Sequence, residues 1–381
     1  MKLLLVAGEA SGDLLGADLL AGLRQRFPHL QAMGVGGPRL RQQGLQSLFD
    51  VNDLAIIGLV EVVRRLPRLA RVFRHLVELL RNERPDVLIT IDLPDFNLVL
   101  AGQAKRMGIP VIHYVTPQVW AWRPGRVQRI AQRVDHLLVL FPFEPQYYVG
   151  TGLPVTFVGH PLVKQIANRR SREEVRSTLG LTPGEPVLAL LPGSRSGEIA
   201  RLLPTMAETC RRIASLLPEC RFVLAQAETL SREILDRHWP SDSPPAVIVR
   251  QGMTHDLLAA ADVALVASGT ATLEAALLAT PMVVVYRTNR LTYEIGRRII
   301  RVPFISLANL VAGEGIVPER IQDAAEPERL SADLLPLLID PQANQRMRHA
   351  LSIVGTLLST PERSAVDVVA DFLQARTVKM N

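Results

Sequence analysis

The sequence has few cysteines and few aromatic residues, and each shortage excludes a class of protein. Cys210 and Cys220 are its only cysteines, too few for a disulfide framework or a zinc site. We therefore expect two buried, reduced thiols in a cytoplasmic protein. Aromatic residues make up 5% of the chain while hydrophobic residues of all kinds make up 48%, which favours an aliphatic-rich α/β protein and argues against disorder.

Membrane spans and common cofactor motifs are also missing. The apolar run 3–7 is shorter than the hydrophobic part of a secretion signal, and Glu9 and Asp13 follow it closely. The apolar region 256–286 is interrupted by charged residues, glycine and proline, so any membrane contact is expected to be peripheral. There is no Asp-x-Asp motif, no G-x-G-x-x-G spacing, no zinc spacing and no basic tail, so we expect no metal, no cofactor and no nucleic acid.

The length and the repeating pattern of the chain predict two domains. A chain of 381 residues exceeds what one hydrophobic core usually holds. Short apolar runs alternate with helical patterns, which predicts an α/β fold of two Rossmann-like domains with mostly parallel sheets, residues 1–165 and 166–381. The expected strands are 2–7, 31–35, 87–91, 111–114, 136–140, 155–158, 186–191, 221–226, 246–250, 262–267 and 282–286. Of the C-terminal helical patterns, near 326–339, 342–358 and 361–375, one is free to pack back on the first domain.

One stretch of the second half combines a strand, a turn of phosphate size, a helix and a second strand. It runs from 263 to Arg287 and carries Ser268, Gly269, Thr270, Ala271 and Thr272 in the turn. Backbone N–H groups at such a helix start favour an anion, and Glu274, one turn on, would reach a sugar hydroxyl beside it. The structural alternative is that Thr270 or Thr272 caps the helix and Glu274 favours its first turn electrostatically.

The end of the first strand offers a second polar turn. Glu9, Ser11 and Asp13 supply hydrogen-bonding groups there, between the flexible Gly8 and Gly12. A polar ligand would fit this turn. The alternative for Ser11 is a helix cap.

Asp92 follows a strongly apolar strand and precedes Pro94, which suits a helix start. We therefore expect its carboxylate at the sheet edge, facing a cleft. There it could accept a proton from an attacking hydroxyl, with its pKa raised if the cleft closes. An Asx-turn is the structural alternative.

Three further loops carry polar or aromatic groups. Gly193, Ser194 and Arg195 form a strand-to-helix turn with a delocalised cation suited to phosphate oxygens. Asn309 is a neutral donor and acceptor in a later loop. Trp120 is one of two tryptophans in a loop near 113–123, where a packed wall or a sugar or acyl contact is equally open.

The segment 58–80 has an apolar stripe and an arginine stripe, the composition of a helix that lies on anionic lipid. The net charge of +6 suits such a surface, although a phosphorylated substrate or nucleic acid would suit it as well. A core-packing helix with a solvated basic face is the alternative. The residues expected to contact membrane or acyl chains are Val60, Val63, Leu66, Leu69 and Phe73.

Taken together, the motifs resemble those of the lipid-A-disaccharide synthase family over nearly the whole chain. They are VAGEASGD at 6–13, DLPDFN at 92–97, VWAWR at 119–123, LPGSR at 191–195 and SGTATLE at 268–274. The resemblance implies a GT-B fold with a cleft between two domains. It also implies an inverting, metal-independent transfer of 2,3-diacylglucosamine from its UDP conjugate to 2,3-diacylglucosamine 1-phosphate. The products would be a β-1,6-linked disaccharide and UDP, made in lipopolysaccharide lipid A biosynthesis by a peripheral protein of the inner membrane.

The resemblance assigns roles to individual residues. Asp92 would be the base for the acceptor's 6-hydroxyl, and Arg195 and Asn309 are the family's other activity-critical positions. We assign Arg195 to the leaving diphosphate and leave the role of Asn309 open. The turn with Ser268, Gly269, Thr270 and Thr272 would hold the phosphates, and Glu274 the ribose.

The residues themselves complete the list of expected substrate or nucleotide contacts, which are Glu9, Ser11, Gly12, Asp13, Gly193, Ser194 and Arg287.

The chain departs from the family pattern at Ala308 and Lys164, where a proline and an acid are usual. A homodimer stays open, as do two rival functions. Another UDP-sugar enzyme of this fold, such as a UDP-N-acetylglucosamine epimerase, would not need the amphipathic 58–80 segment. A non-catalytic nucleotide-sugar-binding protein would tolerate loss of Asp92.

Overall fold

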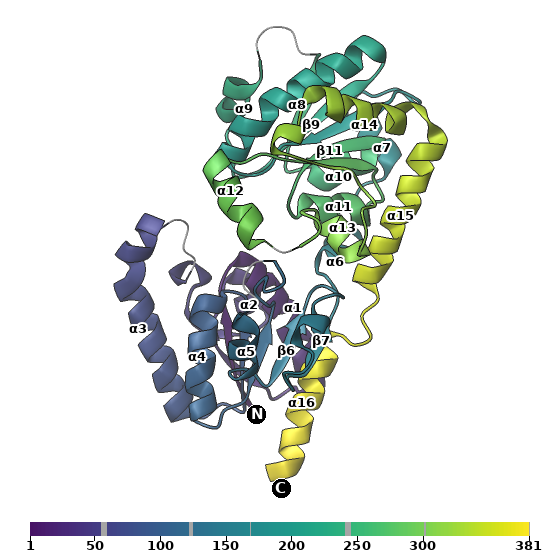
Figure 1. Ribbon diagram of the computed structural model, residues 1–381. Helices are drawn as coiled ribbons and strands as arrows, with labels where there is room; N and C mark the ends of the chain where they lie inside the picture. The colour runs from purple at the N-terminus through teal and green to yellow at the C-terminus, as the bar shows by residue number, and fades with distance from the viewer. Residues whose placement is uncertain (55–58, 122–124, 168, 241–244, 301, 381) are drawn as a thin grey trace. The chain divides into compact units, whose positions relative to one another are not determined.

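The computed structural model describes residues 1–381 except 55–58, 122–124, 168, 241–244, 301 and 381, and it describes no side chain within 59–65 or 376–380. The chain divides into two compact units (Figure 1). Unit 1 comprises Met1–His160 and Thr360–Asn381, and unit 2 comprises Pro161–Ser359. Each unit is a Rossmann-like α/β domain built on one parallel sheet.

Unit 1 has a seven-stranded sheet in the order β3-β2-β1-β4-β5-β6-β7, with every pair parallel. Its strands are β1 Lys2–Ala7, β2 Gln31–Val35, β3 Gln46–Phe49, β4 Val87–Ile91, β5 Val111–Tyr114, β6 His136–Val139 and β7 Val155–Phe157. Its helices are α1 Ala10–Arg26, α2 Pro38–Gln42, α3 Leu59–Glu83, α4 Pro94–Arg106, α5 Arg126–Ala131 and α16 Ala365–Met380, with 3₁₀ turns at Val51–Asp53 and Pro145–Tyr148. β4 is buried along its whole length because helices cover both sheet faces, which explains its continuous apolar sequence.

Unit 2 has a six-stranded parallel sheet in the order β10-β9-β8-β11-β12-β13. Its strands are β8 Val187–Leu191, β9 Arg221–Gln226, β10 Val247–Gln251, β11 Val263–Ala267, β12 Met282–Tyr286 and β13 Glu319–Ile321. The first helices are α6 Leu162–Ala167, α7 Arg172–Thr178, α8 Ser196–Leu216, α9 Arg232–His238 and α10 Thr254–Ala260. The others are α11 Ala271–Leu277, α12 Arg290–Ile299, α13 Leu307–Ala312, α14 Pro327–Ile339 and α15 Pro341–Ser359, with a 3₁₀ turn at Gln322–Ala324.

Both sheets reverse their strand order at an equivalent place. The reversal lies between β1 and β4 in unit 1 and between β8 and β11 in unit 2. Ligands of open α/β sheets bind beyond the carboxyl ends of the strands at such a switch point. In unit 1 the preferred ligand site is therefore lined by the loops that follow β1 and β4, and in unit 2 by the loops that follow β8 and β11. We call this side of each sheet the ligand edge of its unit.

The strand predictions are confirmed for the eleven strands expected, to within about a residue at either end. Two strands were not predicted, β3 and β13. Both are short edge strands of four and three residues without a single fully buried position. They therefore lack the apolar run by which the other strands are recognised.

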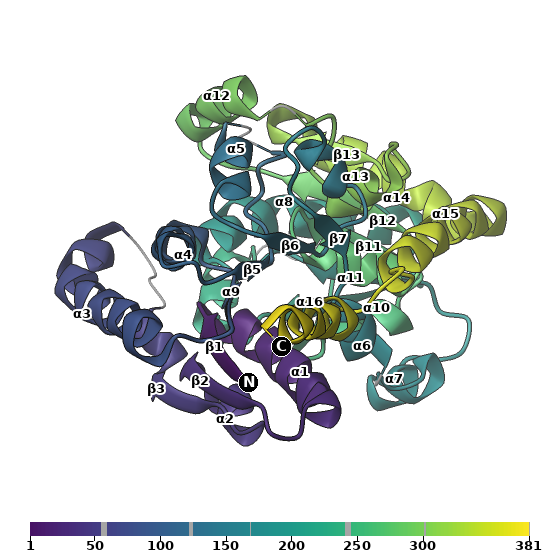
Figure 2. The ribbon, with the colours of Figure 1, turned by 90° about the horizontal axis from the view of Figure 1, so that it is seen from below.

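The last helix lies with unit 1, in agreement with the expectation that one C-terminal helical pattern is free to pack back on the first domain. The division at residue 165 had placed it with the second domain. α16 packs along α1 (Figure 2), with Val368, Val369 and Leu373 buried in the unit 1 core. A side chain at Gly22 of α1 would come within 2.6 Å of Val366, so the glycine permits this close approach. The physical reason for the difference is the apolar face of α16, which completes the unit 1 core.

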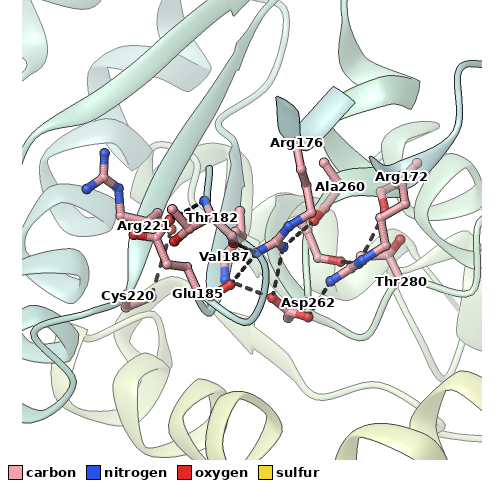
Figure 3. A network of polar contacts seen from close by, with 12 residues as sticks. Arg172, Arg176, Thr182, Glu185, Val187, Cys220, Arg221, Ala260, Asp262 and Thr280 are labelled. Atoms are coloured by element: carbon pink, nitrogen blue, oxygen red, sulfur yellow. Dashed lines mark hydrogen bonds and ion pairs between the residues drawn. The ribbon is translucent and has the colours of Figure 1, made fainter. Parts of the chain in front are cut away.

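Two arginines connect the segments that precede β8 and β11, at the amino ends of these strands (Figure 3). Arg176 donates to the carbonyls of Ala260, Thr182 and Glu185, and Arg172 pairs with Asp262 at 2.6 Å. Asp262 also accepts a hydrogen bond from the Val187 amide. A cavity of about 740 Å³ opens beside these groups, at the sheet end opposite to the ligand edge, so we read it as part of the scaffold.

Candidate active site

The ligand edge of unit 1 is built on a close approach between the ends of β1 and β4. The Gly8 amide donates to the Ile91 carbonyl at 3.1 Å, and a side chain at Gly8 would come within 2.3 Å of Leu93. Asp92 and Leu93 both have left-handed backbone angles, with φ of 55° and 44°. Two consecutive residues of this kind are costly without glycine, and such strain concentrates at functional sites.

A buried asparagine maintains this strained turn. Asn97, in the first turn of α4, donates from Nδ2 to the carbonyls of Asp92 at 2.7 Å and Ile91 at 3.2 Å. Its side chain is fully buried. Asn97 therefore fixes the backbone that carries Asp92, and sequence reasoning, which placed it only in a helix start, missed this function.

The two carboxylates at this edge are harder to ionise than ordinary ones. Burial raises the pKa of Asp92, although a hydrogen bond from the Leu93 amide to Oδ1 at 2.8 Å opposes the rise. The pKa of Glu9 is raised by burial and by the nearby Asp92 charge. A carboxylate with a raised pKa is a better proton acceptor, so Asp92 is suited to act as a general base.

Of the other residues predicted in this turn, Asp13 has a structural role. It is buried and accepts hydrogen bonds from the amides of Gly37, Arg39 and Leu40, which start α2. Three of the roughly four acceptor sites of its carboxylate therefore serve α2. Ser11 is exposed, and the helix is capped from Glu9 without a side-chain bond, so the capping alternative for Ser11 does not apply. Gly12 is buried in α1 against Ile91.

The ligand edge of unit 2 begins after β8 with an arginine held at its backbone and open at its side chain. Arg195 is the cap residue of α8, and Glu198 accepts from the amides of Ser194 at 3.0 Å and Arg195 at 3.2 Å. The turn needs Gly193 because its φ is 105°. The Arg195 side chain is 84% exposed and has a single long ion pair with Glu198 at 3.4 Å, so its guanidinium can reach an anion.

The turn after β11 lies beside it. The amides of Thr272, Leu273 and Glu274 bond to carbonyls of Gly269 and Thr270. Within the described chain, the amides of Gly269, Thr270 and Ala271 donate no hydrogen bond to another protein group. Nothing lies within 4 Å of a side chain built on Gly269, so the space above the turn is open. The turn can therefore present several donors to one anion.

Two hydroxyls predicted to bind phosphate are used inside the protein instead. Ser268 donates to the Ile305 carbonyl at 2.9 Å, and the buried Thr272 donates to the Gly269 carbonyl at 2.8 Å. The first bond ties the turn to the loop before α13. The second stiffens the turn itself. Thr270, which is exposed, keeps its hydroxyl available.

Two adjoining cavities occupy this edge. One of about 380 Å³ is lined by Arg195, Gly269 and Thr270, among others. The next, of about 540 Å³, is lined by Gln226, Gly252 and His255, among others, and shares Ala227, Thr254 and Glu274 with the first. The pair can hold a ligand with an anionic end and a flat polar end, joined near Glu274.

His255 is a site residue that sequence reasoning missed. Its Nε2 lies 3.4 Å from Oε1 of Glu274, which itself is only partly exposed. Sequence reasoning emphasised the turns after β8 and β11, and His255 follows the edge strand β10. The strand order makes β10 part of the same edge, and only the fold supplies that order.

Arg287 and Asn309, predicted as site residues, have their polar groups engaged within unit 2. Arg287 donates to the Thr205 hydroxyl at 2.9 Å and to carbonyls of Ala325 and Gln322. Asn309 is 1% exposed. It donates to the Val317 carbonyl and to Glu319 and accepts from the Val317 amide at 3.0 Å. Arg287 therefore stabilises the end of β12. Asn309 stabilises the loop before α13, to which Ser268 is also hydrogen-bonded.

Aromatic residues in the loops of unit 1 form a packed wall. Trp120 is buried, donates to Glu144 at 3.3 Å and meets Phe143 edge-on. Burial raises the Glu144 pKa to about 7. The ring of Trp120 is therefore structural, and Trp122 and Arg123 lie outside the described residues. His160 packs against Phe141, and burial lowers its pKa to about 4.

The predicted membrane stripe of α3 divides into packed and exposed parts. Leu69 and Phe73 pack against the unit 1 core, Phe73 edge-on against Phe96. Leu66 is 51% exposed. The side chains of Val60 and Val63 lie outside the described residues. The core-packing alternative therefore holds for Leu69 and Phe73, and the membrane hypothesis depends on the start of the helix.

The described residues include no helix with an apolar stretch of the length that a membrane span needs. The same residues contain no group of three or more histidine, cysteine, aspartate or glutamate side chains that could hold a metal ion.

Comparison with known proteins gives consistent results. The family described as Lipid-A-disaccharide synthetase matches residues 3–366. A lipid-A-disaccharide synthase of Pseudomonas aeruginosa is 44% identical over 376 residues, 99% of each chain. The fold is similar to a UDP-GlcNAc 2-epimerase of Neisseria meningitidis bound to UDP-GlcNAc, with TM-score 0.62 and 13% identity over 98% of this chain and 100% of that one. A calicheamicin glycosyltransferase has TM-score 0.58 and 16% identity over 98% of both chains.

Proposed function

The chain belongs to the lipid-A-disaccharide synthetase family and is thereby a GT-B glycosyltransferase, and from this premise we propose its substrates and the division of work in its site. The donor is the UDP conjugate of 2,3-diacylglucosamine. The acceptor is 2,3-diacylglucosamine 1-phosphate, and the products are the β-1,6-linked disaccharide 1-phosphate of lipid A and UDP. The observation that carries this proposal is the contrast between a carboxylate edge in unit 1 and an anion-binding edge in unit 2.

Unit 2 binds the donor's nucleotide. The diphosphate occupies the 380 Å³ cavity, where Arg195 and the amides at 269–271 face its oxygens. Glu274 accepts from the ribose hydroxyls, and the base enters the 540 Å³ cavity beside His255. As the bond from the anomeric carbon to the phosphate oxygen breaks, its electron pair leaves with UDP, and the guanidinium and amides stabilise that charge.

Unit 1 binds the acceptor and supplies the base. Asp92 accepts the proton of the acceptor's 6-hydroxyl while that oxygen forms a bond to the anomeric carbon from the side opposite to UDP. The configuration at that carbon is therefore inverted. Glu9 and Ser11, which are exposed at the same edge, bind the acceptor's polar groups. Asn97 acts through the backbone, as a positioning residue for Asp92.

The acylated substrates place the protein at the inner membrane as a peripheral protein. We assign the unit 1 contact to the start of α3. Leu66 is exposed there, and Arg68, Arg71 and Arg74 follow it in exposed positions. This arrangement, an apolar residue among cations, suits an anionic lipid surface.

Product analysis tests the proposal. Purified protein is mixed with both diacylated substrates in detergent, and disaccharide and UDP are measured by mass spectrometry. We expect equal amounts of the two products, with and without a chelator, since the charge on UDP is met by protein groups. Loss of turnover on chelation would refute metal independence. Turnover of UDP-N-acetylglucosamine in place of the acylated donor, or its epimerisation, would favour the rival enzyme class.

A further inference from the structure

Helix α12 of unit 2 presents its apolar row to solvent. Leu291, Ile295 and Ile299 are spaced four residues apart and lie on one face. They are 72%, 50% and 47% exposed, and no residue of the helix is buried. Tyr293 and Gly296, on the other side, are only partly exposed. A surface helix normally buries its apolar stripe, so α12 is oriented the opposite way.

The charges of α12 are mostly positive. Arg290, Arg297 and Arg298 stand against a single acid, Glu294, which pairs with Arg297 at 2.7 Å. Arg298 borders the apolar row by helical position. Arg290 and Arg297 lie on the opposite side of the helix from the row, so Arg298 is the arginine that flanks it. An exposed aliphatic row with a bordering arginine matches the interface of an anionic bilayer, where the row enters the acyl boundary and the arginine meets a lipid phosphate.

The N-terminal end of α12 is attached to the folded part of unit 2. Before the helix, the Thr288 amide donates to the Gln322 side chain at 2.6 Å, and that side chain donates back to the Thr288 carbonyl at 3.0 Å. Asn289 caps the helix by accepting from the Thr292 amide at 2.7 Å. Further along the chain, Glu319 accepts from the amides of Ile305 and Ser306, both at 2.9 Å. The start of α12 is therefore fixed to unit 2.

We propose that α12 is a membrane-binding helix of unit 2, which docks on anionic phospholipid through Leu291, Ile295, Ile299 and Arg298, while Arg290 and Arg297 add to its positive charge. It is distinct from the contact assigned to α3 in unit 1. α12 follows β12, the strand next to β11 in the sheet. The turn after β11, which we assign to the nucleotide, is linked to the segment that follows α12, because Ser268 donates a hydrogen bond to the Ile305 carbonyl. Docking through α12 brings the donor-binding edge of unit 2 to the lipid surface. This inference does not depend on which sugar is transferred.

Vesicle flotation tests the proposal with full-length protein. Vesicles of equal parts phosphatidylcholine and phosphatidylglycerol are compared with vesicles of phosphatidylcholine alone. The triple variant Leu291→Ser, Ile295→Ser, Ile299→Ser should lose at least about tenfold in partitioning to the anionic vesicles. Arg290→Gln with Arg297→Gln and Arg298→Gln should reduce binding to the anionic vesicles and leave the weak binding to neutral ones unchanged.

A matched control comes from α15 of the same unit. Ile353 and Leu357 are 51% and 37% exposed, four residues apart, with no arginine after Arg348 in that helix. Ile353→Ser with Leu357→Ser should bind vesicles like the unchanged protein. Disaccharide formation in detergent should be unchanged in all these variants, which separates this test from that of the proposed function.

Two outcomes would overturn the proposal. The first is full vesicle binding by the triple serine variant, with an unchanged melting temperature. The second is a change in its oligomeric state by sedimentation without a change in vesicle binding, which would assign the apolar row to a second copy of the chain.

Discussion

The two units share a strand order and differ in the charge that each places at its switch point. In unit 1 the loops after β1 and β4 carry Glu9 and Asp92, acids whose pKa values burial raises. In unit 2 the loops after β8 and β11 carry Arg195 and a turn of open amides. Under the proposed function, one scaffold serves a proton acceptor and an anion site, because the strand ends can be changed without altering the sheet.

The largest effect on turnover is expected from a substitution of the base that we propose in unit 1. Asp92→Asn keeps the shape of the side chain and removes its basicity, so turnover should fall about 10²- to 10⁴-fold. UDP binding by isothermal titration should be unchanged, because the two cavities proposed for the nucleotide belong to unit 2. The control is Asp95→Asn, a neighbouring carboxylate that is 80% exposed and paired with Arg126. Equal losses in both variants would contradict the assignment of Asp92 as the base.

The next largest effect on turnover is expected from a substitution in the anion site that we propose in unit 2. Arg195→Ala removes the cation that we assign to the leaving diphosphate, and we expect turnover to fall about 10²- to 10³-fold. UDP affinity should weaken as well, since product and leaving group share this charge. Arg201→Ala is the control, because Arg201 is exposed in the same helix and bonds only to the Gly197 carbonyl there among the described contacts. A normal turnover rate in Arg195→Ala would exclude the assigned role.

A buried asparagine supports the ligand edge of each unit. In unit 1, Asn97 donates to the carbonyls of Ile91 and Asp92. Asn309 satisfies three hydrogen bonds in a fully buried place. Asn309→Ala leaves the Val317 amide and carbonyl unsatisfied, so the free energy of unfolding should fall by about 1–3 kcal/mol in urea titrations. Unchanged stability with a large loss of turnover would instead assign Asn309 to the chemistry.

The smallest effect concerns pH. Asp92 must be ionised to accept a proton, so kcat/KM should rise with pH through its pKa, which burial places above the ordinary aspartate range. The Asp92 charge contributes to the raised pKa of Glu9, whereas the rise at Asp92 comes from burial. Glu9→Gln should therefore leave the acid limb of the pH profile in place. A limb that moves to lower pH in Glu9→Gln would show that the Glu9 charge also acts on Asp92.

Much of the fold could be predicted because buried parallel strands are continuous apolar runs. The ligand edges followed from the same pattern, since Asp92, Arg195 and Gly269 each come directly after such a run. Which polar residues at these edges are available could not be predicted. Asp13 serves the amides that start α2, and Arg287 closes onto Thr205. These partners lie far away in the sequence, so only the folded chain brings them together.

The same limit applies to helix faces. The apolar stripes of α3 and α12 look alike in sequence, but α3 packs Leu69 and Phe73 on the core while α12 leaves its row in solvent. Periodicity predicts that a helix has an apolar face and does not say what covers it.

The return of α16 to unit 1 sets an order of assembly during synthesis. Unit 2 is complete at Ser359, whereas the core of unit 1 still lacks Val368, Val369 and Leu373 at that point. On the ribosome, the first unit to be translated is thus the last to be finished. The core of unit 1 is completed only after α16 has been synthesised, and unit 2 can fold before then.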